Sequence, residues 1–231
     1  MLRGLVLLIA CIAAAPLRAE TVNVDIDGAA VTLAVPAGHC PLDRANPFDR
    51  TVIETVERAV ATSNRVLVAF AECGQLAEVR AGQRRVLDDF GQYMSPVRGG
   101  KVDSAAPDFA QKMTEVFKSQ GAQLMQGAEA ETREKISAMR LGIRMGENRL
   151  LGVLRTDQRA SYLGLVQNLG LPDGSNKIQL GIVAMGVVKQ RIVSLNVYSR
   201  FEEGPSGAAT TLKLLGVSVL TYEAMAAANA Q

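Results

Sequence analysis

The fold of this chain is decided by the stretch from Lys177 to Phe201, which reads KIQLGIVAMGVVKQRIVSLNVYSRF. Both halves are rich in branched apolar residues, which favour extended backbone. Only Lys189 and Gln190 separate the halves, and so short a connection fits a tight hairpin. The stretch therefore predicts two adjacent antiparallel strands, Lys177–Val188 and Arg191–Phe201.

Other extended segments precede this pair. Residues 65–71 form an almost continuous apolar run, which predicts a strand buried on both faces. Near the N-terminus, apolar and polar residues alternate on both sides of Asp27 and Gly28, which predicts a two-stranded hairpin. The remaining predicted strands cover 21–26, 30–35, 89–97, 146–155 and 160–170.

Helical periodicity separates these strands. Asn46 can cap a helix and Pro47 suits its first turn, which predicts a helix over 47–62. The longest helix begins at Pro107, and the charged segment Gly127–Lys135 predicts that it breaks or projects there, with a solvated outer face as the alternative. Further helical segments are expected at 74–80 and 207–229. This order predicts an α+β fold in one domain, residues 20–231, with an antiparallel sheet flanked by helices.

The first nineteen residues have the features of an export signal. Arg3 precedes an apolar run from Leu5 to Ala15, which is too short to span a bilayer. Ala19 suits cleavage before Glu20, so residues 1–19 are predicted to be a signal peptide. The alternative is a lipobox ending at Cys11, which would be acylated. Cleavage predicts a soluble periplasmic or secreted protein.

The charge balance argues against a nucleic-acid partner. Removal of the signal takes away Arg3 and Arg18 and no acidic residue, so the formal net charge falls from +2 to 0. A protein without a strong net positive charge lacks the usual electrostatic attraction to the phosphates of nucleic acids. Membrane attachment is not expected either, unless the long helix or an acylated Cys11 supplies it.

Cys40 and Cys73 are the cysteines that remain after cleavage, an even number in a compartment that permits disulfides. We expect them to pair, because a crossover between two parallel strands would bring both to one sheet edge. Two alternatives stay open: a pair of buried apolar thiols, or a reactive thiol that uses the adjacent His39.

His39 is the only histidine, so any Ser-His-Asp or Cys-His mechanism must use it. We expect a loop histidine without a catalytic duty. One histidine and two cysteines offer no recognised metal-ligand spacing, and the sequence contains no P-loop, GxGxxG or GxSxG motif. The sequence therefore predicts no metal site and no cofactor.

Three stretches carry a resemblance to a known family: Val35–Asp43, Val66–Leu76 and Val188–Ser199. They resemble small exported proteobacterial proteins of uncharacterised role, and the order of elements is similar to the PsbP-like α/β/α sandwich. The resemblance implies a domain used as an accessory or binding partner of larger assemblies. It carries no catalytic motif that transfers to this chain.

These observations together favour a non-enzymatic accessory or binding protein of the periplasm, with a protein partner in the cell envelope. The alternative is an uncharacterised enzyme, possibly a hydrolase, with a site near His39 and Cys40. The two hypotheses differ in whether His39 touches a reacting group.

Overall fold

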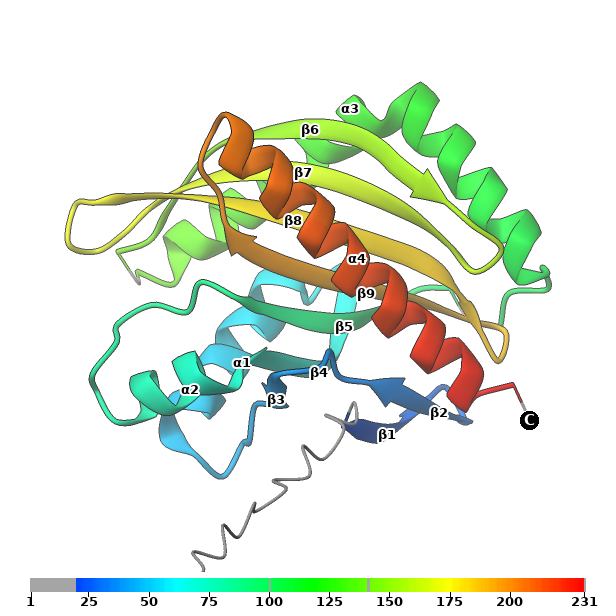
Figure 1. Cartoon of the computed structure of the whole chain (residues 1–231), viewed down its shortest axis with the longest axis horizontal. Coiled ribbons are helices and arrows are strands. Elements are labelled where there is room, and N and C mark those ends of the chain that lie inside the picture. Colours follow the sequence, from blue (N-terminus) through cyan, green and yellow to red (C-terminus); the bar gives the residue numbers. More distant parts are fainter. Residues whose placement is uncertain (1–19, 100, 141, 231) are drawn as a thin grey trace, which may run out of the picture.

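The computed structural model describes residues 20–99, 101–140 and 142–230, so the predicted signal peptide, 1–19, and Cys11 lie outside it. The chain folds as an α+β domain in which a large antiparallel sheet packs against helices (Figure 1). The helices are α1 (Pro47–Val60), α2 (Cys73–Arg80), α3 (Ala106–Ala138) and α4 (Pro205–Ala228). The strands are β1 (Thr21–Ile26), β2 (Ala29–Ala34), β3 (His39–Pro41), β4 (Asn64–Glu72), β5 (Phe90–Pro96), β6 (Arg144–Thr156), β7 (Ala160–Gly170), β8 (Asn176–Val188) and β9 (Arg191–Arg200).

The strands of the main sheet lie in the order β3-β4-β5-β9-β8-β7-β6, and every neighbouring pair is antiparallel. The predicted hairpin is present, with Val188 opposite Arg191. Its two turn residues, Lys189 and Gln190, both have positive φ, at 46° and 60°. Such a turn matches the right-handed twist of the strands that it joins. The antiparallel meander β6–β9 is therefore confirmed.

Helices cover the two faces of this sheet (Figure 1). One face carries α4, which contacts β8 and β9, and the β1–β2 hairpin packs beside it. The other face carries α1, over β4, and α3, over β6 to β8. The antiparallel sheet flanked by helices is thus confirmed, and its two faces are covered in different ways.

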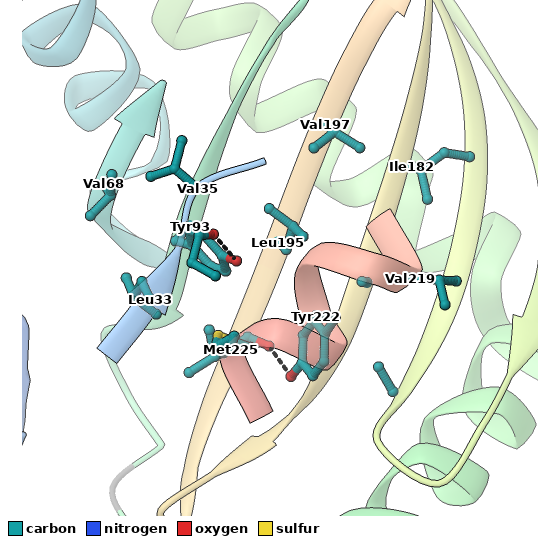
Figure 2. Close-up of a cluster of buried hydrophobic side chains, with 14 of the residues drawn as sticks. Leu33, Val35, Val68, Tyr93, Ile182, Leu195, Val197, Val219, Tyr222 and Met225 are labelled. Carbon is teal, nitrogen blue, oxygen red and sulfur yellow. Dashed lines mark hydrogen bonds between the residues drawn. The ribbon is translucent and has the colours of Figure 1, made fainter. Parts of the chain in front are cut away.

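The main hydrophobic core lies between the sheet and α4 (Figure 2). Its largest side chains include Tyr93 and Tyr222, which are at most 1% exposed. Each donates a hydrogen bond from its hydroxyl to a backbone carbonyl: Tyr93 to Ala34 at 2.7 Å and Tyr222 to Val193 at 3.1 Å. Because a buried hydroxyl without a partner is costly, these bonds fix where the hairpin and α4 sit on the sheet.

Helix α3 is continuous from Ala106 to Ala138, so the predicted break or projection over Gly127–Lys135 is wrong. Its charged residues pair along the helix, Arg133 with Glu129 and Lys135 with Glu131. Lys135 also donates to the hydroxyl of Thr62 at 2.6 Å, just beyond the end of α1. These contacts offset the poor helical propensity of glycine, and they hold this half of α3 against the rest of the domain.

The edge of the sheet near the disulfide departs from the expectation in two respects. The sequence did not predict β3, a three-residue strand that pairs with the end of β4. The predicted strand before Cys40, 30–35, belongs to the separate β1–β2 sheet, and β3 pairs antiparallel with β4, so no parallel crossover brings the two cysteines together. Strand β4 is buried over Val68–Ala71, whereas its first residues are only half-buried.

Candidate functional site

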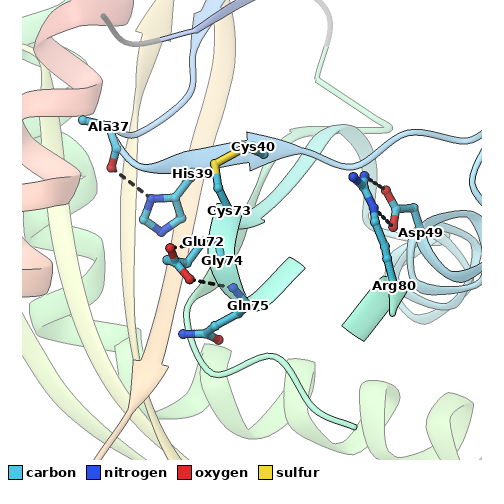
Figure 3. The surroundings of a disulfide bond; sticks show 9 residues. All are labelled: Ala37, His39, Cys40, Asp49, Glu72, Cys73, Gly74, Gln75 and Arg80. Carbon is cyan, nitrogen blue, oxygen red and sulfur yellow. Dashed lines mark hydrogen bonds and ion pairs between the residues drawn. A yellow bond between two sulfur atoms is a disulfide. The ribbon is translucent and has the colours of Figure 1, made fainter. Parts of the chain in front are cut away.

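Cys40 and Cys73 form a disulfide, with their Cα atoms 5.1 Å apart (Figure 3). Cys40 lies opposite Ala71 in the β3–β4 ladder, and the chain turns from β4 into α2 at Cys73. Antiparallel pairing therefore places the two sulfurs together, and the predicted bridge is confirmed. Both alternatives, buried free thiols and a reactive Cys40, are overturned, because a disulfide sulfur is neither a free thiol nor a thiolate nucleophile.

His39 lies next to this disulfide and faces Glu72 across the β3–β4 ladder. Its Nδ1 atom is 3.3 Å from the carbonyl oxygen of Ala37, and its ring meets the edge of Phe70 at 5.7 Å between centroids. Burial lowers the pKa of His39, and this effect outweighs the contact with Ala37 and the carboxylates of Asp89 and Glu72, which raise it. The imidazole is therefore neutral near pH 7.

The carboxylate of Glu72 caps α2 (Figure 3). It accepts hydrogen bonds from the backbone N–H groups of Gly74 at 3.0 Å and Gln75 at 2.7 Å. These bonds lower the pKa of Glu72, so the group is ionised at neutral pH. Both carboxylate oxygens are thus engaged in holding the start of the helix that follows Cys73.

A cavity of about 240 Å³ opens beside His39, on the face of the sheet that α4 covers. Asp89, Ser199 and Lys213 line it together with His39 and Glu72. Ser199 donates its hydroxyl to Asp89 at 2.5 Å, and the amide of Gln75 donates to the second oxygen of Asp89 at 2.7 Å. The tertiary structure therefore gathers a hydroxyl, an imidazole, two carboxylates and an amine around one cavity.

The order of hydrogen bonds in this cavity differs from that of a serine hydrolase. In that mechanism the serine hydroxyl donates to a histidine, which in turn donates to a carboxylate. Here Ser199 donates directly to Asp89, and Nδ1 of His39 faces the Ala37 carbonyl. The arrangement can bind a small polar group, but it lacks the relay that would activate Ser199.

Sequence reasoning placed His39 correctly beside the disulfide and missed Ser199 and Lys213 as its neighbours. Asp89 was likewise not among the predicted site residues. The available signal was positional: Asp89 directly precedes β5, and Ser199 lies near the end of β9. Neighbouring antiparallel strands bring the start of one beside the end of the other, but only the strand order shows that β5 and β9 are neighbours.

An ion pair between two helices supports the outer edge of this region. Asp49 of α1 is fully buried and is paired with Arg80 at the end of α2, with one bond of 3.1 Å from Nε (Figure 3). Asp49 also accepts the backbone N–H of Asp43 at 2.8 Å. The pair ties α1 to α2 across the loop that follows β3.

Within 20–99, 101–140 and 142–230, no group of three or more His, Cys, Asp or Glu side chains is placed to hold a metal ion. No helix in this part of the chain combines the length and apolar character needed to cross a membrane. No known family model matches the chain, and no curated protein matches it either.

Proposed function

We propose that this chain is a non-enzymatic accessory protein of the cell envelope that acts by binding a protein partner. It is exported by the segment 1–19 and works in the periplasm or outside the cell. The confirmed disulfide supports this location, because disulfides persist in oxidising compartments. The finer likeness to the PsbP-like sandwich belongs to the same proposal, since that fold serves accessory roles elsewhere.

The outer face of α4 is the observation that carries the proposal. Leu212 and Leu220 are 72% and 68% exposed, although most of the other large apolar side chains in the domain are buried or half-buried. Gly216 lies between them at helical spacing, and no neighbouring atom is within 4 Å of the position that a Cβ would take there. Two exposed leucines flanking a glycine on one helix face allow close approach of a partner's apolar surface.

Site-specific photo-crosslinking in intact cells tests this proposal. A photoreactive amino acid at position 212 or 220 is expected to capture the same partner, identified by mass spectrometry. The matched control position is Gln123, which is exposed on α3 at the opposite side of the sheet. An adduct shared by 212 and 220 but absent at 123 supports docking on α4. Equal capture at all three positions, or no adduct at 212 and 220, contradicts it.

The second candidate function is hydrolysis at the cavity beside His39. The observation in its favour is the grouping of His39, Asp89 and Ser199 around that cavity. If this candidate holds, Ser199→Ala and His39→Ala should each remove activity toward a generic ester such as p-nitrophenyl acetate. If the wild type hydrolyses the ester no faster than the two variants do, this candidate is wrong, and the proposed binding role is unaffected.

A further inference from the structure

A broad cavity of about 510 Å³ lies at one end of the main sheet, where three segments of the chain meet. These segments are the loop from α2 to β5, the turn from β7 to β8 with the start of β8, and the end of β9. They lie on the same side of the domain, at the left of Figure 1. The volume is within the range of small-molecule sites.

The loop that walls this cavity is fixed to the sheet by Lys177. Its ammonium group donates to the carbonyl oxygen of Leu87 at 2.5 Å and pairs with the carboxylate of Asp88 at 3.1 Å. The side chain of Lys177 is only 8% exposed, and its amine lies 5.6 Å from the centre of the Phe90 ring. Gln75 accepts the backbone N–H of Asp88 at 2.8 Å. The loop is therefore held in place before any ligand arrives.

The lining of the cavity has more basic than acidic side chains: Arg84, Arg85, Lys177 and Arg200 against Asp88 and Glu202. Two of the basic side chains are paired within the protein. Arg84 contacts Asp88 at 3.1 Å and Glu78 at 2.7 Å, and Lys177 shares Asp88. The other two, Arg85 and Arg200, are exposed and form no ion pair with the described part of the chain.

The positive charge of Arg200 acts on the buried amine of Lys177. Burial lowers the pKa of Lys177 and Arg200 lowers it further, although the contact with Asp88 raises it. Arg85 helps to lower the pKa of Asp173, after the hydrogen bonds that this carboxylate accepts from Ser175. Asp173 is not part of the lining. Both guanidinium groups thus keep their charge available for a bound anion.

Apolar side chains form the rest of the lining: Val86, Leu171, Ile178 and Phe201. Ile178 is 37% exposed, which is unusual for a large apolar side chain in this domain. Low-dielectric walls concentrate the field of like charges inside a cleft. The combination suits an anion that also carries an apolar group.

We propose that this cavity binds a small organic dianion, whose two negative charges meet Arg85 and Arg200 and whose apolar part contacts Ile178. A guanidinium group presents parallel N–H donors that match carboxylate and phosphate oxygens equally well. The shared chemistry is therefore that of a dicarboxylate or a phosphate monoester. The cavity does not include Leu212 or Leu220, so a failure of this proposal leaves the docking face of α4 unaffected.

Four probes built on one benzene ring test the charge of the ligand. Phthalate and phenyl phosphate are dianions at pH 8, benzoate is a monoanion and benzamide is neutral. Titration of the ¹⁵N-labelled mature chain is followed by NMR at constant ionic strength. At least one dianion should bind about 5-fold or more tightly than benzoate, and benzamide should bind most weakly. The tighter of the two dianions identifies the carboxylate or the phosphate source.

The same spectra locate the site. The amide signals of 84–88, 175–178 and 200–202 should shift with either dianion that binds. Equal affinity for all four probes, no binding of either dianion, or shifts confined to other parts of the chain would overturn the proposal.

Matched charge variants identify the contacts. Arg85→Gln and Arg200→Gln should each weaken binding of the tighter dianion about 3- to 10-fold and reduce its advantage over benzoate. Arg98→Gln removes the same charge from an exposed position beyond the far end of β5, so the affinity should change less than about 2-fold. Equal losses in all three variants would show that net charge alone attracts the probe, which overturns the site.

The acid in the lining supplies a test of opposite sign. Glu202→Gln removes a negative charge from the cavity, so binding of the dianion should tighten about 2- to 5-fold. Glu134→Gln is the control, because this exposed residue lies on α3 and outside the lining. Each variant is used only if its NMR spectrum keeps the dispersion of the folded wild type. A Glu202→Gln affinity no higher than that of the control contradicts the assigned cavity.

Discussion

Cys40 on the edge strand β3 is covalently joined to Cys73 at the first residue of α2, with 5.1 Å between their Cα atoms. The bond closes a segment with a sequence separation of 33 residues, which contains α1 and all of β4. It also holds β3, a three-residue strand at the edge of the sheet that pairs with the end of β4. The edge that presents His39 therefore depends on this disulfide.

Removal of the disulfide should lower the free energy of unfolding by about 3–4 kcal/mol, because the unfolded chain regains the entropy of an open loop of this length. The measurement is urea unfolding of the Cys40→Ala, Cys73→Ala double variant against the oxidised wild type. Reductant should destabilise the wild type by a similar amount and leave the double variant unaffected. A loss below about 1 kcal/mol would contradict this account, because it would mean that the bond barely restricts the unfolded chain.

His39 should make the free energy of unfolding depend on pH as the pH falls from about 6.5. Burial lowers its folded-state pKa below the usual value of 6.5, so the unfolded chain takes up the proton first as the pH falls. The contribution of His39 is complete above pH 6.5 and is lost as the pH falls toward the lower folded pKa. Glu72 titrates below 4.5 and does not contribute in this range.

The measurement for His39 is the unfolding free energy of wild type and His39→Gln at several pH values from 7.5 to 5. The variant should show a flatter profile, whatever its absolute stability, because glutamine does not titrate. Parallel profiles for the two proteins would mean that the imidazole is protonated equally well in both states.

Arg80→Leu should destabilise the domain by about 2–3 kcal/mol. It leaves the carboxylate of Asp49, which is fully buried, without its cationic partner. The effect is smaller than for a completely buried pair, because the side chain of Arg80 is 34% exposed. Arg84→Leu is the matched control: its partners Glu78 and Asp88 are 47% and 24% exposed instead of fully buried, so the loss should stay below about 1 kcal/mol. Similar losses in both variants would argue against a special role for the Asp49 pair.

Two glycine substitutions should have opposite signs. At Gly186 a Cβ would lie 2.2 Å from the Arg159 carbonyl oxygen and 2.5 Å from the Tyr222 hydroxyl, so Gly186→Ala should cost about 3 kcal/mol. At Gly127, within α3, a Cβ meets nothing within 4 Å, so Gly127→Ala should stabilise by about 0.5–1 kcal/mol. Thermal unfolding measures both. A neutral Gly186→Ala would show that α4 can shift away from β8.

The predictions from sequence succeeded where the signal is local. A two-residue connection between apolar runs predicts a hairpin wherever the chain places it, and the Lys189–Gln190 turn is of this kind. The Asn46 cap is likewise local: its side chain accepts from the backbone N–H groups of Phe48 and Asp49. The continuity of α3 was not predictable in this way, because the contacts that offset Gly121 and Gly127 come partly from Thr62, far away in the sequence.

The residues of the candidate site show the same difference between local signals and long-range contacts. Pairing of Cys40 with Cys73 followed from their number, but the antiparallel β3–β4 ladder that brings them together did not. His39 was recognised because it is the sole histidine. Its neighbour Ser199 was not, because it lies far away in the sequence, on β9. Gln167 and Gln179 lie opposite each other in β7 and β8, at positions of a sheet face that alternation marks as outward. That this face is covered by α1 and α3 is not visible in the sequence.

The amino-acid sequence by itself determined the antiparallel hairpins, most helix boundaries, the α+β class and the identity of the disulfide partners. Periodicity, caps and turns depend on residues close together in the chain, and the disulfide partners followed from the number of cysteines. Tertiary structure alone decided the strand order, the neighbours of His39 and the cavity lined by Arg85 and Arg200. These features join residues that are far apart in the chain, and their positions depend on how β5 and β9 pair and on which face α3 packs.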